Sequence, residues 1–157
     1  MDFTSDLKKL IGQEYIGLDA EWRPVFNYGQ KEIPSIFQIA TEKYAFIIDL
    51  KSFDDKPTLY KKLDSVLCEI FEDKRSLVIG FDFQNDLNAL KSGYYQSKFI
   101  EVLKKNIYDM QIFGKRAANL QTQPGLKKIC EHFITDRKLC KVETCSNWDQ
   151  RPLRKSQ

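Results

Sequence analysis

Two acidic residues spaced for one face of a strand are the first feature that could do chemistry. Asp19 and Glu21 lie in the segment Tyr15 to Trp22, whose apolar alternation predicts a β-strand. Side chains two positions apart on a strand share a face and lie about 6.5 Å apart. Carboxylates held this close repel each other, and a divalent cation relieves that repulsion. Taken alone, the pair is most simply interpreted as two solvated acids on an exposed strand face, and a metal site is the functional interpretation.

A third acid, Asp86, stands in the first turn of a predicted helix, Asn85 to Ser92, which follows a short apolar run at Ser76 to Phe81. A carboxylate at this position interacts favourably with the helix dipole, which is its simplest explanation. In the functional interpretation it faces the strand pair, so that three acids converge on metal. The nearby Asp82 is expected to face a loop or solvent.

Other common chemistries lack their residues. The chain has one histidine, His132, which excludes HExxH metalloproteases and zinc sites built from several histidines. No G-x-x-x-x-G-K-[ST], G-x-G-x-x-G or G-x-S-x-G motif is present. The 22 Asp and Glu residues make carboxylate and metal chemistry the first class to consider.

The elements that must position these acids follow from the apolar patterns. An antiparallel meander followed by alternating helices and strands predicts a mixed sheet with helices packed on it, a three-layer α/β fold in one domain. The length of 157 residues suits a single domain. The expected strands are 15–22, 34–41, 44–50, 76–81 and 106–110, and the expected helices are 58–71, 85–92, 99–103 and 125–133.

Charge and cysteine usage bear on partners and compartment. The net charge is +3, and residues 98–157 carry 13 Lys or Arg against 6 Asp or Glu. This excess indicates an anionic partner such as nucleic acid, with a solvated basic surface as the alternative. Four cysteines without a secretory signal indicate an intracellular protein with reduced thiols, in the nucleus or the cytoplasm. No apolar run is long enough for a membrane span, so no membrane partner is expected.

Taken in order, these segments resemble the DEDDy-type 3′–5′ exonuclease domains of ribonuclease D and Werner helicase, which have a ribonuclease H-like fold. The resemblance covers about residues 14–157 and is closest for the Mut-seven and Nibbler subgroup. It is carried by Ile16-Gly17-Leu18-Asp19-Ala20-Glu21-Trp22, by Val78-Ile79-Gly80-Phe81-Asp82-Phe83-Gln84-Asn85-Asp86-Leu87-Asn88-Ala89-Leu90, and by Ser146-Asn147-Trp148-Asp149-Gln150-Arg151-Pro152-Leu153.

The resemblance implies a metal-dependent exonuclease that releases nucleoside 5′-monophosphates from the 3′ ends of single-stranded RNA or DNA. It implies two divalent cations, Mg²⁺ or Mn²⁺, with Asp19 bridging both. Phe83 either stacks on a base or packs in the core. The implied site residues are Asp19, Glu21 and Asp86 for catalysis and metal binding, and Ala20, Trp22 and Phe83 for substrate binding.

One feature of the family pattern is missing. In the family, a helix bearing Tyr-x-x-x-Asp follows the Arg-Pro-Leu segment, and this sequence ends at Gln157 before such a helix. We therefore expect residues 1–157 to form one C-terminally incomplete exonuclease domain without its last helix. The alternatives are a catalytically impaired nucleic-acid-binding fragment or isoform, and a hydrolase of a small phosphate ester. Neither the protein partners nor the preference between RNA and DNA follows from the sequence.

Overall fold

The computed structural model describes residues 3–27, 29–136, 138–140, 142–143 and 145–157. Short 3-10 helices at Lys8–Leu10 and Leu50–Phe53 accompany the main elements. The strands are β1 (Tyr15–Glu21), β2 (Ile36–Ala40), β3 (Ala45–Asp49), β4 (Leu77–Gly80) and β5 (Ile107–Asp109). The α-helices are α1 (Phe3–Leu7), α2 (Pro57–Phe71), α3 (Gln84–Tyr94), α4 (Lys98–Asn106), α5 (Met110–Ala117) and α6 (Leu126–Phe133).

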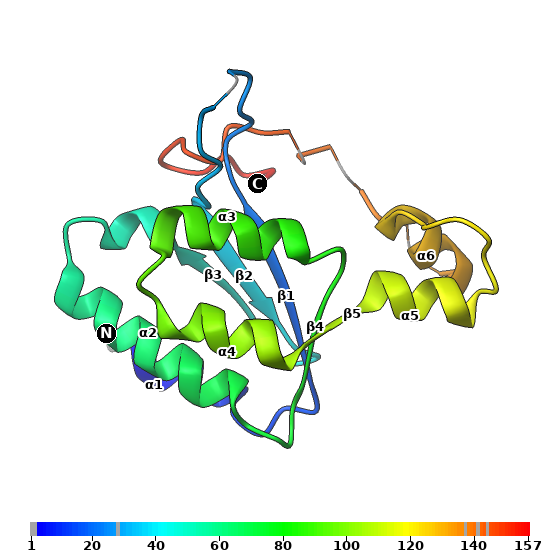
Figure 1. The fold of residues 1–157 in the computed structure, drawn as a ribbon, viewed down its shortest axis with the longest axis horizontal. Coiled ribbons are helices and arrows are strands. Elements are labelled where there is room, and N and C mark those ends of the chain that lie inside the picture. Colours follow the sequence, from blue (N-terminus) through cyan, green and yellow to red (C-terminus); the bar gives the residue numbers. More distant parts are fainter. Residues whose placement is uncertain (1–2, 28, 137, 141, 144) are drawn as a thin grey trace.

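A five-stranded mixed sheet in the order β3-β2-β1-β4-β5 forms the centre of the molecule (Figure 1). The β1–β2 and β2–β3 pairs are antiparallel, whereas β1–β4 and β4–β5 are parallel. The expected hairpin is present, with Ala40 opposite Ala45. The predicted mixed α/β sheet is thereby confirmed, and β1, which carries the acid pair, is its central strand.

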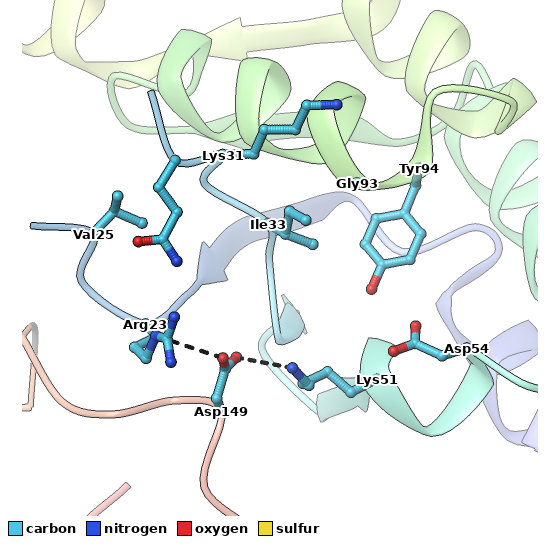
Figure 2. A pocket seen from close by; sticks show the side chains of 10 residues that line it. Arg23, Val25, Lys31, Ile33, Lys51, Asp54, Gly93, Tyr94 and Asp149 are labelled. Carbon is cyan, nitrogen blue, oxygen red and sulfur yellow. Dashed lines mark ion pairs between the residues drawn. The ribbon is translucent and has the colours of Figure 1, made fainter. Parts of the chain in front are cut away.

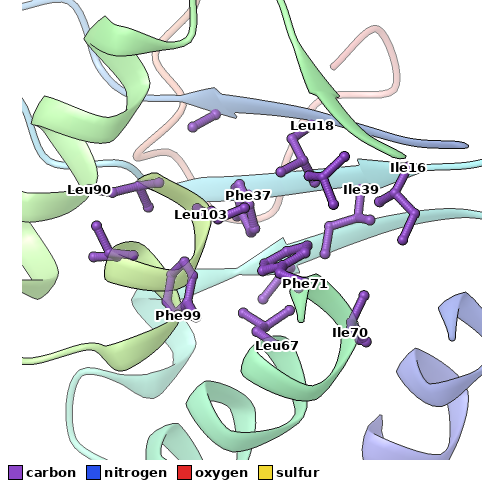
Figure 3. Close-up of a cluster of buried hydrophobic side chains, with 14 of the residues drawn as sticks. Ile16, Leu18, Phe37, Ile39, Leu67, Ile70, Phe71, Leu90, Phe99 and Leu103 are labelled. Atoms are coloured by element: carbon purple, nitrogen blue, oxygen red, sulfur yellow. The ribbon is translucent and has the colours of Figure 1, made fainter. Parts of the chain in front are cut away.

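The hydrophobic core lies between one face of the sheet and the helices α2 and α4 (Figure 3). Leu18 and Phe37 from the sheet belong to this core together with Phe71 from α2 and Phe99 from α4, and all four are buried. The Phe37 ring meets Phe71 edge to face at a centroid distance of 6.4 Å, and it lies 5.9 Å from Phe99. This packing fixes β1 and β2 against a rigid layer of helices.

The second face of the sheet carries the acid pair. Gly17 pairs with Ala40 and Asp19 pairs with Gln38, so these four residues share one face. In the described part of the chain this face stays open at Ile47 of β3, which is 57% exposed. Figure 1 shows α5 and α6 to one side of the sheet, beyond β5. Within the described residues, Ile47 is therefore left uncovered on this face.

Two helices were not expected from the sequence. Helix α5 begins at Met110, which the sequence pattern assigned to the last strand, and Asp109 caps it by accepting a hydrogen bond from the Gln111 backbone N–H at 2.8 Å. Helix α1 has only five residues, too few for a periodic pattern to reveal. Among the described residues, no helix is long and apolar enough to cross a bilayer.

Candidate active site

Strand β1 presents Asp19 and Glu21 on the open face of the sheet. The neighbouring Leu18 and Ala20 point into the core, where they are buried, while Asp19 is exposed and Glu21 is partly buried. The alternation of the sequence predicts this arrangement, because strand side chains alternate between the two faces. The backbone at Ala20 therefore lies at the surface of the sheet between the two acids.

Asp86 reaches β1 from the first turn of α3. The Ala20 backbone N–H donates to Oδ1 of Asp86 and to Oδ1 of Asp19, each at 3.0 Å. One main-chain donor thus holds a carboxylate from each of two distant segments. Asp86 points toward the acid pair rather than away from it, as the functional interpretation requires.

The turn from β4 into α3 places Asp86 in this position. A Cβ atom on Gly80 would lie 2.7 Å from the Phe83 side chain, so only glycine permits this close approach. Asp82 in the same turn has a φ of 54°, and its backbone N–H donates to the Asp109 carboxylate at 3.0 Å. The Asp109 side chain therefore connects this turn to the start of α5.

Electrostatics set Asp86 apart from the other acids. Burial, together with the negative charge of Asp19, raises the pKa of the Asp86 carboxyl to about 7, although the hydrogen bond from the Ala20 N–H opposes the shift. The side chain is 7% exposed. A buried acid beside a second carboxylate is costly to ionise, and a cation bound between the two would remove that cost.

A cleft of about 740 Å³ opens above these acids. Asp19, Glu21 and Asp86 all line it, together with Asp82. Of the predicted substrate-binding residues, Ala20 and Trp22 also line the cleft. Further lining residues were not among the predicted site residues, and they include Gln38, Gln111, Leu126, Leu139, Cys140 and Cys145.

Phe83 is placed differently from the other predicted substrate residues. Its side chain is 2% exposed and belongs to the hydrophobic core. It is absent from the lining of the cleft. Of the two interpretations of Phe83, the structure supports core packing, because a ring enclosed by apolar neighbours presents no face to a base.

The donor chemistry at Asp19 and Asp86 suits a divalent cation, since hard cations prefer carboxylate oxygens and the pair carries unfavourable negative charge. Across the described ranges, however, no three Asp, Glu, His or Cys side chains are grouped so that they could hold a metal ion together. The structure thus brings the carboxylates of Asp19 and Asp86 together. Glu21 lines the same cleft but is not grouped with them around one metal position.

The segment after the cleft wall is anchored to the sheet. Trp148 is buried, and the Arg151 guanidinium binds both carboxylate oxygens of Asp49, at 2.6 and 2.7 Å. The Asp149 carboxylate accepts a hydrogen bond from the Ser35 hydroxyl and does not line the cleft. Cys145, which lines the cleft, therefore lies close in sequence to the anchored Trp148.

This fold, with acids at the centre of an open sheet, is that of the ribonuclease H-like exonuclease domains. A family model described as 3′–5′ exonuclease matches residues 2–157, and the chain belongs to this family. Its members generally use divalent metal ions. Membership confirms the resemblance inferred from the three sequence stretches.

Individual relatives support the same assignment. The chain is 27% identical over 167 residues to the exonuclease mut-7 of Caenorhabditis elegans, covering 98% of this chain and 18% of that protein. It is 29% identical over 161 residues to a ribonuclease D from Desulfotalea psychrophila, covering 98% of this chain and 38% of that protein. The chain thus spans less than half the length of either relative.

Solved structures share the fold. The exonuclease domain of Aedes aegypti Nibbler superimposes with a TM-score of 0.74 at 23% identity, covering 98% of this chain and 73% of that one. Escherichia coli RNase D gives a TM-score of 0.71 at 17% identity, covering 98% of this chain and 36% of that one.

Proposed function

We propose that this domain is a metal-dependent 3′–5′ exonuclease that removes nucleoside 5′-monophosphates from the ends of single-stranded nucleic acid. The observation that carries the proposal is the single Ala20 N–H shared by the carboxylates of Asp19 and Asp86 on the floor of an open cleft. Family membership supports the reaction class. A relative, the RNase D of Trypanosoma brucei, has been crystallised in complex with RNA U12, which supports an RNA strand as substrate.

The chain's own residues have distinct tasks in this proposal. Asp19 and Asp86 would hold the divalent cations, and Glu21 would contribute a further carboxylate from the same strand face. Bound Mg²⁺ or Mn²⁺ lowers the pKa of a water nucleophile and offsets charge on the leaving oxygen. The Ala20 N–H keeps Asp86 oriented toward Asp19. Trp22 and the backbone of Ala20 line the space beside the acids, where the terminal nucleotide binds.

Cleavage of a 5′-labelled single strand in the presence of Mn²⁺ tests the proposal. The wild-type chain should produce a ladder of shortened products, and Asp19→Ala should abolish it, because the cation loses its central ligand. Asp55→Ala is the matched control, since Asp55 is an exposed acid outside the cleft and its loss should leave the ladder intact. A ladder that persists in Asp19→Ala would exclude this site.

Metal binding is tested separately from turnover. Mn²⁺ at about 100 times its dissociation constant should stabilise the wild-type chain by about 2.7 kcal/mol. The Asp19→Ala variant should gain much less, and a calorimetric melting scan with and without Mn²⁺ measures the difference. Equal stabilisation of both chains would place the cation elsewhere.

A second candidate is a nucleic-acid-binding domain without turnover. It is favoured by the spacing of the acids, because in the described ranges no three Asp, Glu, His or Cys side chains are grouped so that they could hold one metal ion. In that case labelled single strands should bind with the same affinity to the wild-type chain and to Asp19→Ala, and neither should cleave them in Mn²⁺.

A further inference from the structure

Two hollows continue from the cleft along the loop that follows β1. The nearer one, of about 390 Å³, is lined by Arg23, Phe26 and Asn27 among others. The farther one, of about 290 Å³, is lined by residues that include Arg23, Lys31 and Lys51 (Figure 2). We call these two hollows together the loop groove.

The loop groove is continuous with the cleft. Trp22 and Pro24 line the cleft, Pro24 and Arg23 line the nearer hollow, and Arg23 lines both hollows. Cys145 contributes to the cleft and to the nearer hollow. Glu21 and Arg23 are two residues apart, a separation of about 7 Å in extended backbone. A linear polymer whose end lies at the acids of the cleft can therefore continue directly into the loop groove.

In the farther hollow, the Asp149 carboxylate lies between two cationic side chains. Figure 2 shows Arg23 and Lys51 directed toward the Asp149 carboxylate, with Arg23 Nε at 3.8 Å and Lys51 Nζ at 3.3 Å from its oxygens. Lys31 adds a third cation to the lining, and Asp54 is the other acid there. Among the described residues this lining has one positive charge in excess, so a backbone phosphate finds cationic partners there, whereas the metal-free acidic cleft repels it.

The nearer hollow combines an aromatic ring with amides. The Phe26 side chain is 91% exposed, and Asn27, Gln30 and Asn147 line the space beside it. Arg23 contributes a positive charge to this lining. An exposed ring next to a cation and several amides is the combination that binds unpaired bases, since every base has a face for stacking and edges for hydrogen bonds.

We infer that the loop groove binds the part of a single-stranded nucleic acid that lies upstream of the cleaved end. Phe26 stacks on an unpaired base, and Arg23, Lys31 and Lys51 contact backbone phosphates. This inference rests on the proposed function for the direction of the strand. It replaces Phe83, which is buried, with Phe26 as the stacking residue.

Binding of labelled phosphorothioate oligonucleotides, which resist cleavage, tests the groove in the presence of Mn²⁺. A trinucleotide reaches only the cleft, whereas a decanucleotide also fills the groove. The double variant Arg23→Ala/Lys31→Ala should bind the decanucleotide about tenfold more weakly at low salt, with a salt dependence flattened by about 0.7 for each lost phosphate contact. Its affinity for the trinucleotide should change by less than about twofold. Oligouridylate and oligothymidylate arms show whether RNA or DNA is preferred.

The matched control is Lys104→Ala/Lys105→Ala, which removes the same charge from the exposed last turn of α4. This variant should retain decanucleotide affinity. An equal loss in the control, or an equal loss for the trinucleotide, would overturn the assignment of the groove.

Stacking is tested at Phe26. Phe26→Ala should weaken decanucleotide binding by about fivefold or more, and Phe26→Trp should restore it, because base stacking tolerates any aromatic ring. An unchanged affinity in Phe26→Ala would contradict the stacking role. Retained groove binding without cleavage would reject only the exonuclease proposal, whereas cleavage that is unaffected by strand length and by these variants would reject only the groove.

Discussion

At the scale of single residues, the site depends on how Asp86 is held. Its carboxylate is buried and accepts a hydrogen bond from the backbone N–H of Ala20 in β1. It also lies near a second carboxylate, that of Asp19. Burial and like charge raise its pKa to about 7, so the metal-free domain binds a proton there near neutral pH. A proton and a divalent cation therefore compete for the Asp86 carboxylate.

Asp86→Asn should make the metal-free domain more stable at high pH. The folded-state pKa lies above that of the unfolded chain, so ionisation costs stability as pH rises from about 4 to about 7, by a few kcal/mol at most. The neutral amide avoids this cost, and the melting temperature should rise by about 2–4 °C per kcal/mol at pH 8. At pH 4 the variant and the wild type should melt alike.

Melting scans at both pH values in EDTA measure this difference. Asp55→Asn serves as the control for loss of an exposed charge and should show no such pH dependence. An Asp86→Asn variant that gains nothing at pH 8 would mean that the carboxylate ionises freely in the folded state.

At the scale of elements, the apolar patterns predicted the sheet and the helices α2, α3 and α4 because each buries one clear face. Helix α6 was also predicted from its amphipathic pattern, although none of its residues is buried. The strand expected at 15–22 is observed as Tyr15–Glu21, and the helix expected at 58–71 as Pro57–Phe71. Helix α5 was missed because its signal was a single capping residue, Asp109, at the end of a short strand. Local propensity is weakest where one element runs directly into the next.

The candidate site was predictable only where its residues lie on elements that the sequence pattern itself predicted and carry side chains typical of metal sites. The alternation along β1 placed Asp19 and Glu21, and the helix start placed Asp86. Gln111 and Cys145 also line the cleft, but they come from segments whose positions depend on tertiary contacts. Phe83 lies beside the second motif, and only the packing of the turn at Gly80 decides that its ring enters the core.

Gly80→Ala tests how tightly the turn between β4 and α3 is packed. The added Cβ would lie 2.7 Å from the Phe83 side chain, so the turn or the ring must shift, at a cost of about 1–3 kcal/mol. Since the same turn carries Asp86, Mn²⁺ binding should weaken as well. Urea unfolding and Mn²⁺ titration measure the two effects.

Gly125→Ala is the matched control for this substitution. A Cβ at Gly125 meets nothing within 4 Å, and its φ of −79° suits alanine. Because Gly125 is the N-cap of α6 and alanine is the poorer cap, the stability of this variant should fall by about 0.5–1 kcal/mol without any steric shift. Equal effects of the two substitutions would indicate that the turn at Gly80 has room for a side chain.

At the scale of the whole molecule, the cleft exists because a distant segment is fixed over the sheet. Trp148 and Arg151 anchor the residues that follow Cys145, and Arg151 also donates to the carbonyl oxygens of Trp148 and Gln150. The rest of the open face, at Ile47, has no such cover in the described residues. The molecule is therefore rigid on its helical side and held by a few polar contacts on the side of the cleft.

Arg151→Ala should loosen the anchored segment. The bidentate pair with Asp49 is partly exposed, so its loss should cost about 1 kcal/mol. The hydrogen bonds and charge of Arg151 hold the pKa of Asp49 below its ordinary value, so the pair stabilises the fold above about pH 4 and the effect is lost as Asp49 becomes protonated. Urea unfolding at pH 7 and pH 3 should show a clearly smaller difference from the wild type at pH 3 than at pH 7.

Lys155→Ala, at an exposed position in the same segment, controls for loss of a positive charge and should match the wild type at both pH values. A full difference that persists at pH 3 would show that Arg151 acts through its carbonyl contacts rather than through Asp49.

The shared contact at Ala20 has a consequence for how the site can be altered. Since the donor is the backbone N–H of residue 20, every amino acid except proline supplies it. A substitution at this position therefore changes the packing of the buried side chain and leaves the hydrogen-bond donor in place. Alanine scanning would therefore pass over the group that joins the two segments. Replacing this amide by an ester linkage would expose it, and the two acids would then be free to separate.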